Sequence, residues 1–293
     1  MHIQSRVACA VGLSLAVTIG MTALSAAAEQ QTAPPRLKHA PVHVHRNPDG
    51  SPERGMRNQF ISSNWSGYVV ANYQTGRKYT SAQMTWVVPT VIYGTSNDTT
   101  SSTEYSANWV GIGGFCENTL CTRGDNTLIQ LGTEQDVSPS GVANYYAWYE
   151  VLPQAETPLG PGYPVHPGDT ITASLSCNQP CSSRKQTWTL SMQDEPAAPG
   201  QPGWSWSKRL SYGSSLLSAE WIEEAPYEGG ILPLADFRVA SFSGPDMANG
   251  SLPPVSSANA IQMADPWGQW ANPSLASVPN FNVCWAFETF TPC

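Results

Sequence analysis

The chain has 293 residues, a formal net charge of −8 at pH 7 and only 12% charged residues. The negative charge argues against nucleic acid as a partner, because binding to phosphates depends on Lys and Arg. The low charge density predicts a protein that develops little charge repulsion at low pH.

The first 28 residues have the pattern of a secretory signal peptide. Arg6 gives a positive start, residues 7–24 are mostly apolar, and small residues at 25–28 predict cleavage before Glu29. A membrane anchor is the alternative, but the apolar stretch is marginal in length and small residues follow it directly. We therefore expect a secreted, extracellular protein with no membrane association after cleavage.

Residues 29–58, which we call the leader, differ from the rest of the chain. The leader is rich in proline and in basic residues, and it contains His39, His43 and His45. Such a segment is not expected to fold alone. A basic leader ahead of an acidic body predicts either a pro-segment docked on an acidic cleft or an inert export linker. If it is docked, low pH would charge its histidines and neutralise the cleft carboxylates, which predicts acid-triggered release.

The body, residues 59–293, is long enough for one large domain and shows repeated short runs typical of strands. The predicted strands are 65–73, 81–87, 107–112, 127–132, 144–151, 170–176, 185–193, 216–223, 237–242, 261–263 and 283–290. Gly, Pro, Asn and Ser separate these runs, and no segment has a sustained helical period. The pattern predicts an all-β domain, a sandwich or a barrel, and we favour an antiparallel two-sheet β-sandwich.

Six cysteines follow the signal peptide and lie in close sequence pairs. Of the 15 possible pairings the local one is simplest, with disulfides Cys116–Cys121, Cys177–Cys181 and Cys284–Cys293. Such bridges fit an oxidising compartment. A metal site is not expected, because four of the five histidines lie before residue 58 and there is no Cys-x-x-Cys. No cofactor motif is present either.

Residues 218–224 concentrate three carboxylates in five positions. Strand alternation would place Glu220, Ile222 and Glu224 on one face, and Trp221 and Glu223 on the other. A carboxyl group among apolar neighbours has a raised pKa, which suits proton transfer. The alternative is a half-buried strand whose acidic side chains lie at its solvent-exposed edge.

Two further runs carry polar groups among apolar residues. Gln130 is the one amide in the run 127–132, and it is either a satisfied core amide or a donor to a developing oxyanion. The aromatic run 144–150 ends in Glu150, which would share a strand face with Trp148. Aromatic packing within a sheet is the alternative for most of these rings.

Seven short sequence motifs, in the same order along the chain, resemble motifs of the family of glutamic peptidases (eqolisins). The matching words are Ser63–Gly67, Val88–Pro89, Trp109–Ile112, Ile129–Gly132, Ala147–Glu150, Gly168–Asp169 and Ala219–Glu224. The resemblance covers roughly residues 62–240. It implies a concanavalin A-like jelly roll and a pepstatin-insensitive endopeptidase that cleaves proteins under acidic conditions. We assume a monomer.

Carried over residue by residue, the resemblance implies a catalytic dyad of Glu224 and Gln130. Glu224 would take a proton from the attacking water and then give one to the leaving amine. Gln130 would position the water and stabilise the oxyanion. The resemblance also implies that Trp65, Trp109 and Glu150 bind and orient the substrate.

The chain departs from the family pattern at two positions, where Gly113 and Tyr146 stand in place of acids. Fewer like charges predict a smaller rise in the pKa of Glu224, so the enzyme would work at lower pH. Two other functions fit a sandwich: a non-catalytic carbohydrate-binding module and an endoglucanase. An endoglucanase would use Glu134 and Asp136, which resemble part of a glucanase motif, although the third acid that this motif has soon after them is absent.

Overall fold

The computed structural model describes residues 37–293 except 56, 95–101, 179, 248–255, 275–279 and 288–292. The predicted signal peptide and the first residues of the leader lie outside the described residues. The described residues belong to one compact unit. No helix among them is both long and apolar enough to cross a membrane.

The structure is nearly all β, as the sequence predicts. Its elements are β1 (Phe60–Ser62), β2 (Trp65–Ala71), α1 (Asn72–Thr75), β3 (Ser81–Val87), β4 (Glu104–Gly113), β5 (Leu128–Val137), β6 (Ala143–Val151), β7 (Thr157–Pro158), β8 (Thr170–Asn178), β9 (Gln186–Glu195), β10 (Ser205–Tyr212), β11 (Ser218–Glu224), β12 (Val239–Met247), a 3₁₀ turn (Ser257–Asn259), β13 (Ala260–Ala264), β14 (Gln269–Pro273) and β15 (Asn280–Phe287).

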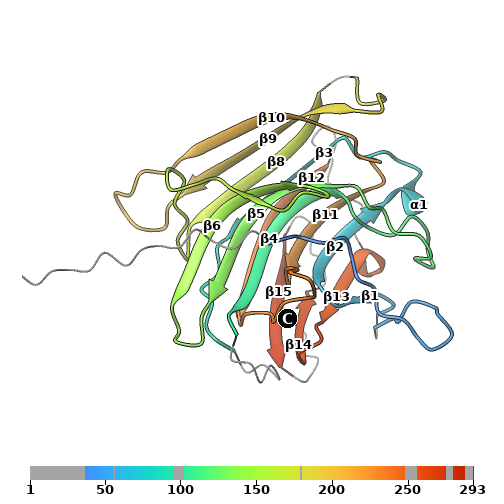
Figure 1. Cartoon of the computed structure of the whole chain (residues 1–293), viewed down its shortest axis with the longest axis horizontal. Coiled ribbons are helices and arrows are strands. Elements are labelled where there is room, and N and C mark those ends of the chain that lie inside the picture. Colours follow the sequence, from blue (N-terminus) through green and yellow to red (C-terminus); the bar gives the residue numbers. More distant parts are fainter. Residues whose placement is uncertain are drawn as a thin grey trace, which may run out of the picture. The chain divides into compact units, whose positions relative to one another are not determined.

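The strands form one hydrogen-bonded succession that folds back on itself. Their order is β10-β9-β8-β3-β12-β15-β14-β13-β2-β11-β4-β5-β6-β7, with β1 paired to β13. The pairs are antiparallel except β1–β13, which is parallel. Although they are distant in this order, β3 packs against β4 and β11, and β8 packs against β4 and β5. Two layers result, which confirms the predicted sandwich. In Figure 1, β2, β11, β4, β5 and β6 run side by side in the layer that carries the site.

The main core lies between the two layers. On β3, Met84 and Trp86 are fully buried, and they alternate with residues that are half-buried or exposed. Burial of such side chains stabilises the fold by about 1.5–3 kcal/mol each. Trp221 on β11 joins this core, whereas its neighbour Ile222 joins a second cluster on the opposite face of the same layer. The predicted alternation of β11 is therefore confirmed.

The second cluster has its own cover. It contains Trp65, Trp109 and Trp148, and the leader residues Val42 and Val44 pack against it. A sheet face lined with tryptophan would otherwise meet water, so covering it removes apolar surface from solvent. The cover is continuous with the body, because Val44 makes a β-bridge with Ser62.

Each of the predicted strands overlaps a strand of the structure, and the three local disulfides Cys116–Cys121, Cys177–Cys181 and Cys284–Cys293 are present. Four strands were not expected: β1, β7, β10 and β14. The longest of them, β10, pairs only with β9 at the end of the sheet, and no residue in it is fully buried. Trp206, Leu210 and Tyr212 alternate along β10 and pack half-buried against the main core, but Lys208 interrupts the apolar series.

Candidate active site

Five adjacent strands place the predicted site residues on the face of the second cluster. Glu224 on β11 pairs with Trp65 on β2, and Ile222 pairs with Trp109 on β4. Gln130 on β5 lies directly opposite Glu150 on β6. All of these side chains are buried. The structure therefore brings together Glu224, Gln130, Trp65, Trp109 and Glu150.

Two glycines make room for this arrangement. A Cβ at Gly132 would lie 2.6 Å from the Cβ of Trp109. A Cβ at Gly111 would lie 2.8 Å from the Trp109 ring and 3.2 Å from the Cβ of Gln130. Both approaches are closer than carbon atoms tolerate without a shift of the backbone or ring. The glycines of the words Trp-Val-Gly-Ile and Gln-Leu-Gly thus let the indole of Trp109 lie against the sheet.

Glu224 is fully buried within a set of hydrogen-bond donors. Trp109 Nε1 donates to Oε2 at 2.7 Å, and Trp65 Nε1 lies 3.3 Å from Oε1. The Asn64 amide approaches Oε1 at 3.4 Å. Burial raises the pKa of Glu224 to about 7, against the opposing effect of the His39 and Trp109 contacts. A carboxyl group held in this way exchanges protons at moderate pH.

Gln130 is oriented by Glu150. The Gln130 Nε2 donates to Glu150 Oε2 at 2.7 Å. Burial raises the pKa of Glu150 well above its ordinary value, although hydrogen bonds from His39 and Gln130 oppose the rise. The His39 backbone N–H also donates to Glu150 Oε2, so this oxygen is an acceptor and the end of the Gln130 amide that faces it is the NH₂.

The leader enters this site through His39, a residue that the sequence analysis had not linked to it. The His39 ring stacks on Trp148 with a centroid distance of 3.6 Å and an interplanar angle of 3°. Its Nδ1 lies 3.1 Å from Glu224 Oε2. Gln130 Nε2 also donates to the His39 carbonyl oxygen at 2.9 Å. One leader residue therefore contacts both members of the predicted dyad.

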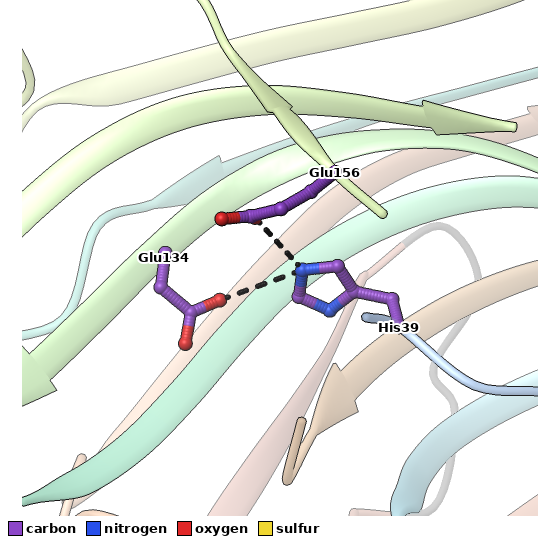
Figure 2. A group of neighbouring side chains, drawn as sticks. All are labelled: His39, Glu134 and Glu156. Carbon is purple, nitrogen blue, oxygen red and sulfur yellow. Dashed lines mark hydrogen bonds and ion pairs between the residues drawn. The ribbon is translucent and has the colours of Figure 1, made fainter. Parts of the chain in front are cut away.

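On its other side the His39 ring meets an acidic group. Its Nε2 lies 3.2 Å from Glu156 Oε2 and 3.7 Å from Glu134 Oε2. Figure 2 shows both carboxylates facing the same ring nitrogen, with Glu134 on β5 and Glu156 on the segment before β7. Both ring nitrogens face carboxyl oxygens, an arrangement in which both can donate only when the imidazole is protonated.

The sequence links Glu134 only to a glucanase-like motif, and no motif includes Glu156. A signal for Glu134 existed, because it lies four residues after Gln130 and so shares its strand face. Glu156 lies in a loop, where no periodicity predicts a direction. Burial raises the pKa of Glu156 to about 8 and that of nearby Asp136 to about 7. These groups hold protons that ordinary carboxylates would lose at neutral pH.

The two departures from the family pattern have structural explanations. Gly113 has φ +96°, and a Cβ there would clash with the Thr127 carbonyl oxygen, so an acid does not fit this backbone. Tyr146 occupies the position of the other acid, and its hydroxyl donates to Glu156 Oε1 at 2.8 Å. The phenol therefore joins the acidic group that surrounds His39.

The donor atoms of His39, Glu134 and Glu156 lie within 4.8 Å of one another, a spacing that could hold a cation. The expectation of no metal rested on the distance of the histidines from the body in sequence, and the fold removes that distance for His39. Since His39 Nε2 already lies at hydrogen-bond distance from Glu156, imidazole–carboxylate contacts account for the group.

The arrangement combines a carboxyl group of raised pKa with an amide that donates to a peptide carbonyl. These are the parts needed to activate water against a peptide bond and to stabilise the resulting oxyanion. Neither the curated proteins nor the solved structures compared with the chain gave a match. The model of the peptidase A4 family, however, matches residues 63–278, which include every predicted site residue.

The match spans well over half of the chain and excludes the leader. It supports neither the carbohydrate-binding module nor the endoglucanase. The chain belongs to the peptidase A4 family, the glutamic peptidases, and is an endopeptidase.

Proposed function

We propose that Glu224 and Gln130 form the catalytic dyad of a secreted endopeptidase that acts under acidic conditions. One observation carries the proposal. Gln130 Nε2 lies 2.9 Å from the backbone carbonyl oxygen of His39, while Glu224 Oε2 lies 3.1 Å from the ring of the same residue. Gln130 thus contacts a peptide carbonyl oxygen while Glu224 lies beside the same residue, which is the placement that hydrolysis of a substrate peptide bond requires.

In the proposed reaction, ionised Glu224 accepts a proton from water as the water oxygen attacks the carbonyl carbon. The amide of Gln130 donates to the oxygen on which negative charge develops. Glu224 then gives its proton to the leaving nitrogen, and the peptide bond breaks. One carboxyl group can serve first as base and then as acid when the pH lies near its own pKa.

The three predicted substrate-binding residues have distinct roles. Trp65 Nε1 donates to the Ala40 carbonyl oxygen at 3.0 Å, which supports backbone binding. Glu150 accepts from the His39 backbone N–H at 3.0 Å and also holds Gln130. Trp109 contacts Glu224 and no leader atom among the hydrogen bonds of the described residues, so we assign it to positioning the base.

We further propose that residues 29–58 are an inhibitory pro-segment that follows a cleaved signal peptide. The burial of Leu37 and His39 within the site supports this assignment. His39 faces the acids Glu224 on β11, Glu134 on β5, Glu150 on β6 and Glu156 before β7, besides the phenol of Tyr146 that binds Glu156. Burial raises the pKa values of Glu224 and Glu156, so these acids already hold protons near neutral pH, and their further protonation does not account for the acid-triggered release that composition predicts.

The proposed function is tested with the secreted protein at about pH 3–5, around the ordinary pKa of glutamate. We expect release of peptides from a denatured protein in the presence of pepstatin, and no release of sugar from a β-glucan. Glu224→Gln and Gln130→Ala should each abolish peptide release. Glu220→Gln, on the same face of β11, is the matched control and should remain active.

Intact wild-type protein that leaves the substrate uncut throughout this range would exclude the proposed function. Undiminished cleavage by Glu224→Gln would exclude the dyad alone. Full activity with residues 29–58 still attached would exclude the inhibitory role of the leader.

A further inference from the structure

Leader residues 37–42 lie across the site with their backbone held from both sides. Lys38 N donates to the Tyr227 carbonyl oxygen at 3.1 Å, and Tyr227 N donates back at 2.9 Å. Glu156 N donates to the Leu37 carbonyl oxygen at 3.0 Å, and Val42 N donates to that of Gly114. Recognition through main-chain hydrogen bonds is how extended peptides bind at a sheet.

One peptide bond of this segment lies at the dyad. The His39 carbonyl oxygen accepts from Gln130 Nε2, the donor that the proposed function assigns to the oxyanion. The next carbonyl oxygen, that of Ala40, accepts from Trp65 Nε1 at 3.0 Å and from the Asn64 amide at 3.3 Å. The register thus places the bond between His39 and Ala40 where a scissile bond is expected.

The His39 side chain explains how this bond survives in the site. Its Nδ1 lies 3.1 Å from Glu224 Oε2, the oxygen that also accepts from Trp109. The other oxygen of Glu224 is approached by Trp65 and Asn64. An attacking water needs one of these oxygens as its proton acceptor, and the imidazole occupies that position.

The ring is held there by more than Glu224. It lies flat on Trp148, and its Nε2 faces Glu156 and Glu134 (Figure 2). Glu224, Glu134 and Tyr146 belong to one row across the sheet, separated at β4 by the small residue Ala107. Because the side chain of Ala107 is only a methyl group, the row leaves space above it for the planar imidazole of His39.

We propose that the leader binds as a blocked substrate, with the His39–Ala40 bond at the dyad and the imidazole in place of the attacking water. This inference rests on the proposed function. Once the ring leaves Glu224, the same bond is the first that the enzyme cuts in its own chain. The water oxygen bonds to the His39 carbonyl carbon, and Glu224 passes a water proton to the Ala40 nitrogen. A carboxyl group on His39 and an amine on Ala40 result.

The test follows self-processing of the full chain in steps from about pH 7 to about pH 4, because the leader-covered Glu224 has a pKa raised by burial, whereas the ordinary pKa of glutamate is about 4.3. Mass spectrometry and N-terminal sequencing identify the first new end. We expect His39→Ala to be processed about tenfold faster or more, the effect of losing one hydrogen bond to a charged group, with Ala40 as the first new N-terminus. The double variant His39→Ala/Glu224→Gln should show no such cut.

His45→Ala is the matched control. It removes a leader histidine that contacts Ser63 Oγ, away from the dyad, and should be processed at the wild-type rate. An unchanged rate in His39→Ala, or a first cut elsewhere in every variant, would overturn the inference.

A second measurement does not depend on folding of the variant. Synthetic peptides of residues 36–46, with His or Ala at position 39, are given to activated wild-type enzyme. The His peptide should inhibit cleavage of a denatured protein, and the Ala peptide should be cut after position 39. Failure of both peptides while the denatured protein is cleaved overturns this inference alone. No cleavage of any substrate overturns the proposed function itself.

Discussion

The amide Nε2 of Gln130 lies 2.7 Å from Oε2 of Glu150, across two neighbouring strands that pair these residues directly. A free glutamine amide rotates, and either end can then face the substrate. The contact with Glu150 removes this freedom, so the NH₂ group faces the His39 carbonyl. Preorganisation of this kind is what makes a hydrogen-bond donor effective toward an oxyanion.

The first prediction concerns this contact. Glu150→Ala should lower the kcat of the activated enzyme about tenfold, less than the roughly 10²–10³ lost when an oxyanion donor is removed outright. Glu150→Gln should restore most of the loss, because its amide oxygen still accepts from Gln130. Steady-state kinetics on both variants provide the measurement. A change confined to KM in Glu150→Ala would show that Glu150 binds substrate without orienting Gln130.

The second prediction concerns the pH dependence of the reaction. Burial raises the pKa of Glu224 to about 7 while the leader covers it. Removal of the leader admits water and should lower that pKa toward the ordinary value of about 4.3. Since activity requires ionised Glu224, the acid limb of kcat/KM should reflect a pKa between these values. An acid limb at or above pH 7 in the activated enzyme would contradict this account.

The third prediction uses the two indoles that contact Glu224. The hydrogen bond from Trp109 at 2.7 Å lowers the pKa of Glu224. Trp109→Phe should therefore move the acid limb upward by about one to two pH units, since such a bond contributes about 1.5–3 kcal/mol and one pKa unit is about 1.36 kcal/mol. Trp65→Phe, which removes a longer contact of 3.3 Å, should cause a smaller shift. Equal shifts of the acid limb in the two variants would contradict the difference between the two indole contacts with Glu224.

The fourth prediction concerns the stability of the full-length chain. Burial raises the pKa of Glu156 to about 8 and those of Glu224 and Asp136 to about 7. The folded state therefore binds more protons than the unfolded chain between about pH 4 and 8, so the free energy of unfolding falls as pH rises through this window. We expect the Tm to fall by at least about 5 °C, since 1 kcal/mol corresponds to about 2–4 °C at this size.

Calorimetry from pH 4 to 8 measures this fall in the Gln130→Ala variant, which keeps the titrating carboxyl groups and is not expected to cut its own chain. Glu156→Gln keeps an acceptor for Tyr146 and removes one titrating group, so its Tm should depend less steeply on pH. A Tm that rises toward pH 8 would contradict the prediction.

The fifth prediction concerns the glycines beneath Trp109. Gly132→Ala should destabilise the fold by about 1–3 kcal/mol, the usual cost of overpacking, because its Cβ would meet the Cβ of Trp109 at 2.6 Å. Gly124→Ala is the control, since a Cβ there meets no atom within 4 Å. Denaturant unfolding compares the two. Equal stability of both variants would show that the layer adapts without cost.

Local sequence patterns determined much of this protein. The alternation of β11 separates Trp221 in the core from Ile222 in the second cluster, and close sequence spacing sets the three disulfides. The short words that predicted the family place Gln130 and Glu224 on one sheet face. Periodicity and short separations are visible in a sequence because they depend only on neighbours along the chain. The edge strand β10 was not predicted, because Lys208 interrupts its apolar alternation.

Only the tertiary structure decided what occupies the site. His39 lies 185 residues before Glu224 and 117 before Glu156, in a segment that carries no strand periodicity. Its place depends on contacts between distant strands and a loop, and composition could predict only that a basic leader suits an acidic body. The carboxylates that surround the imidazole converge because strand register and the small residue Ala107 bring their side chains to one point. Such convergence is a property of the folded sheet, where residues remote in sequence become neighbours.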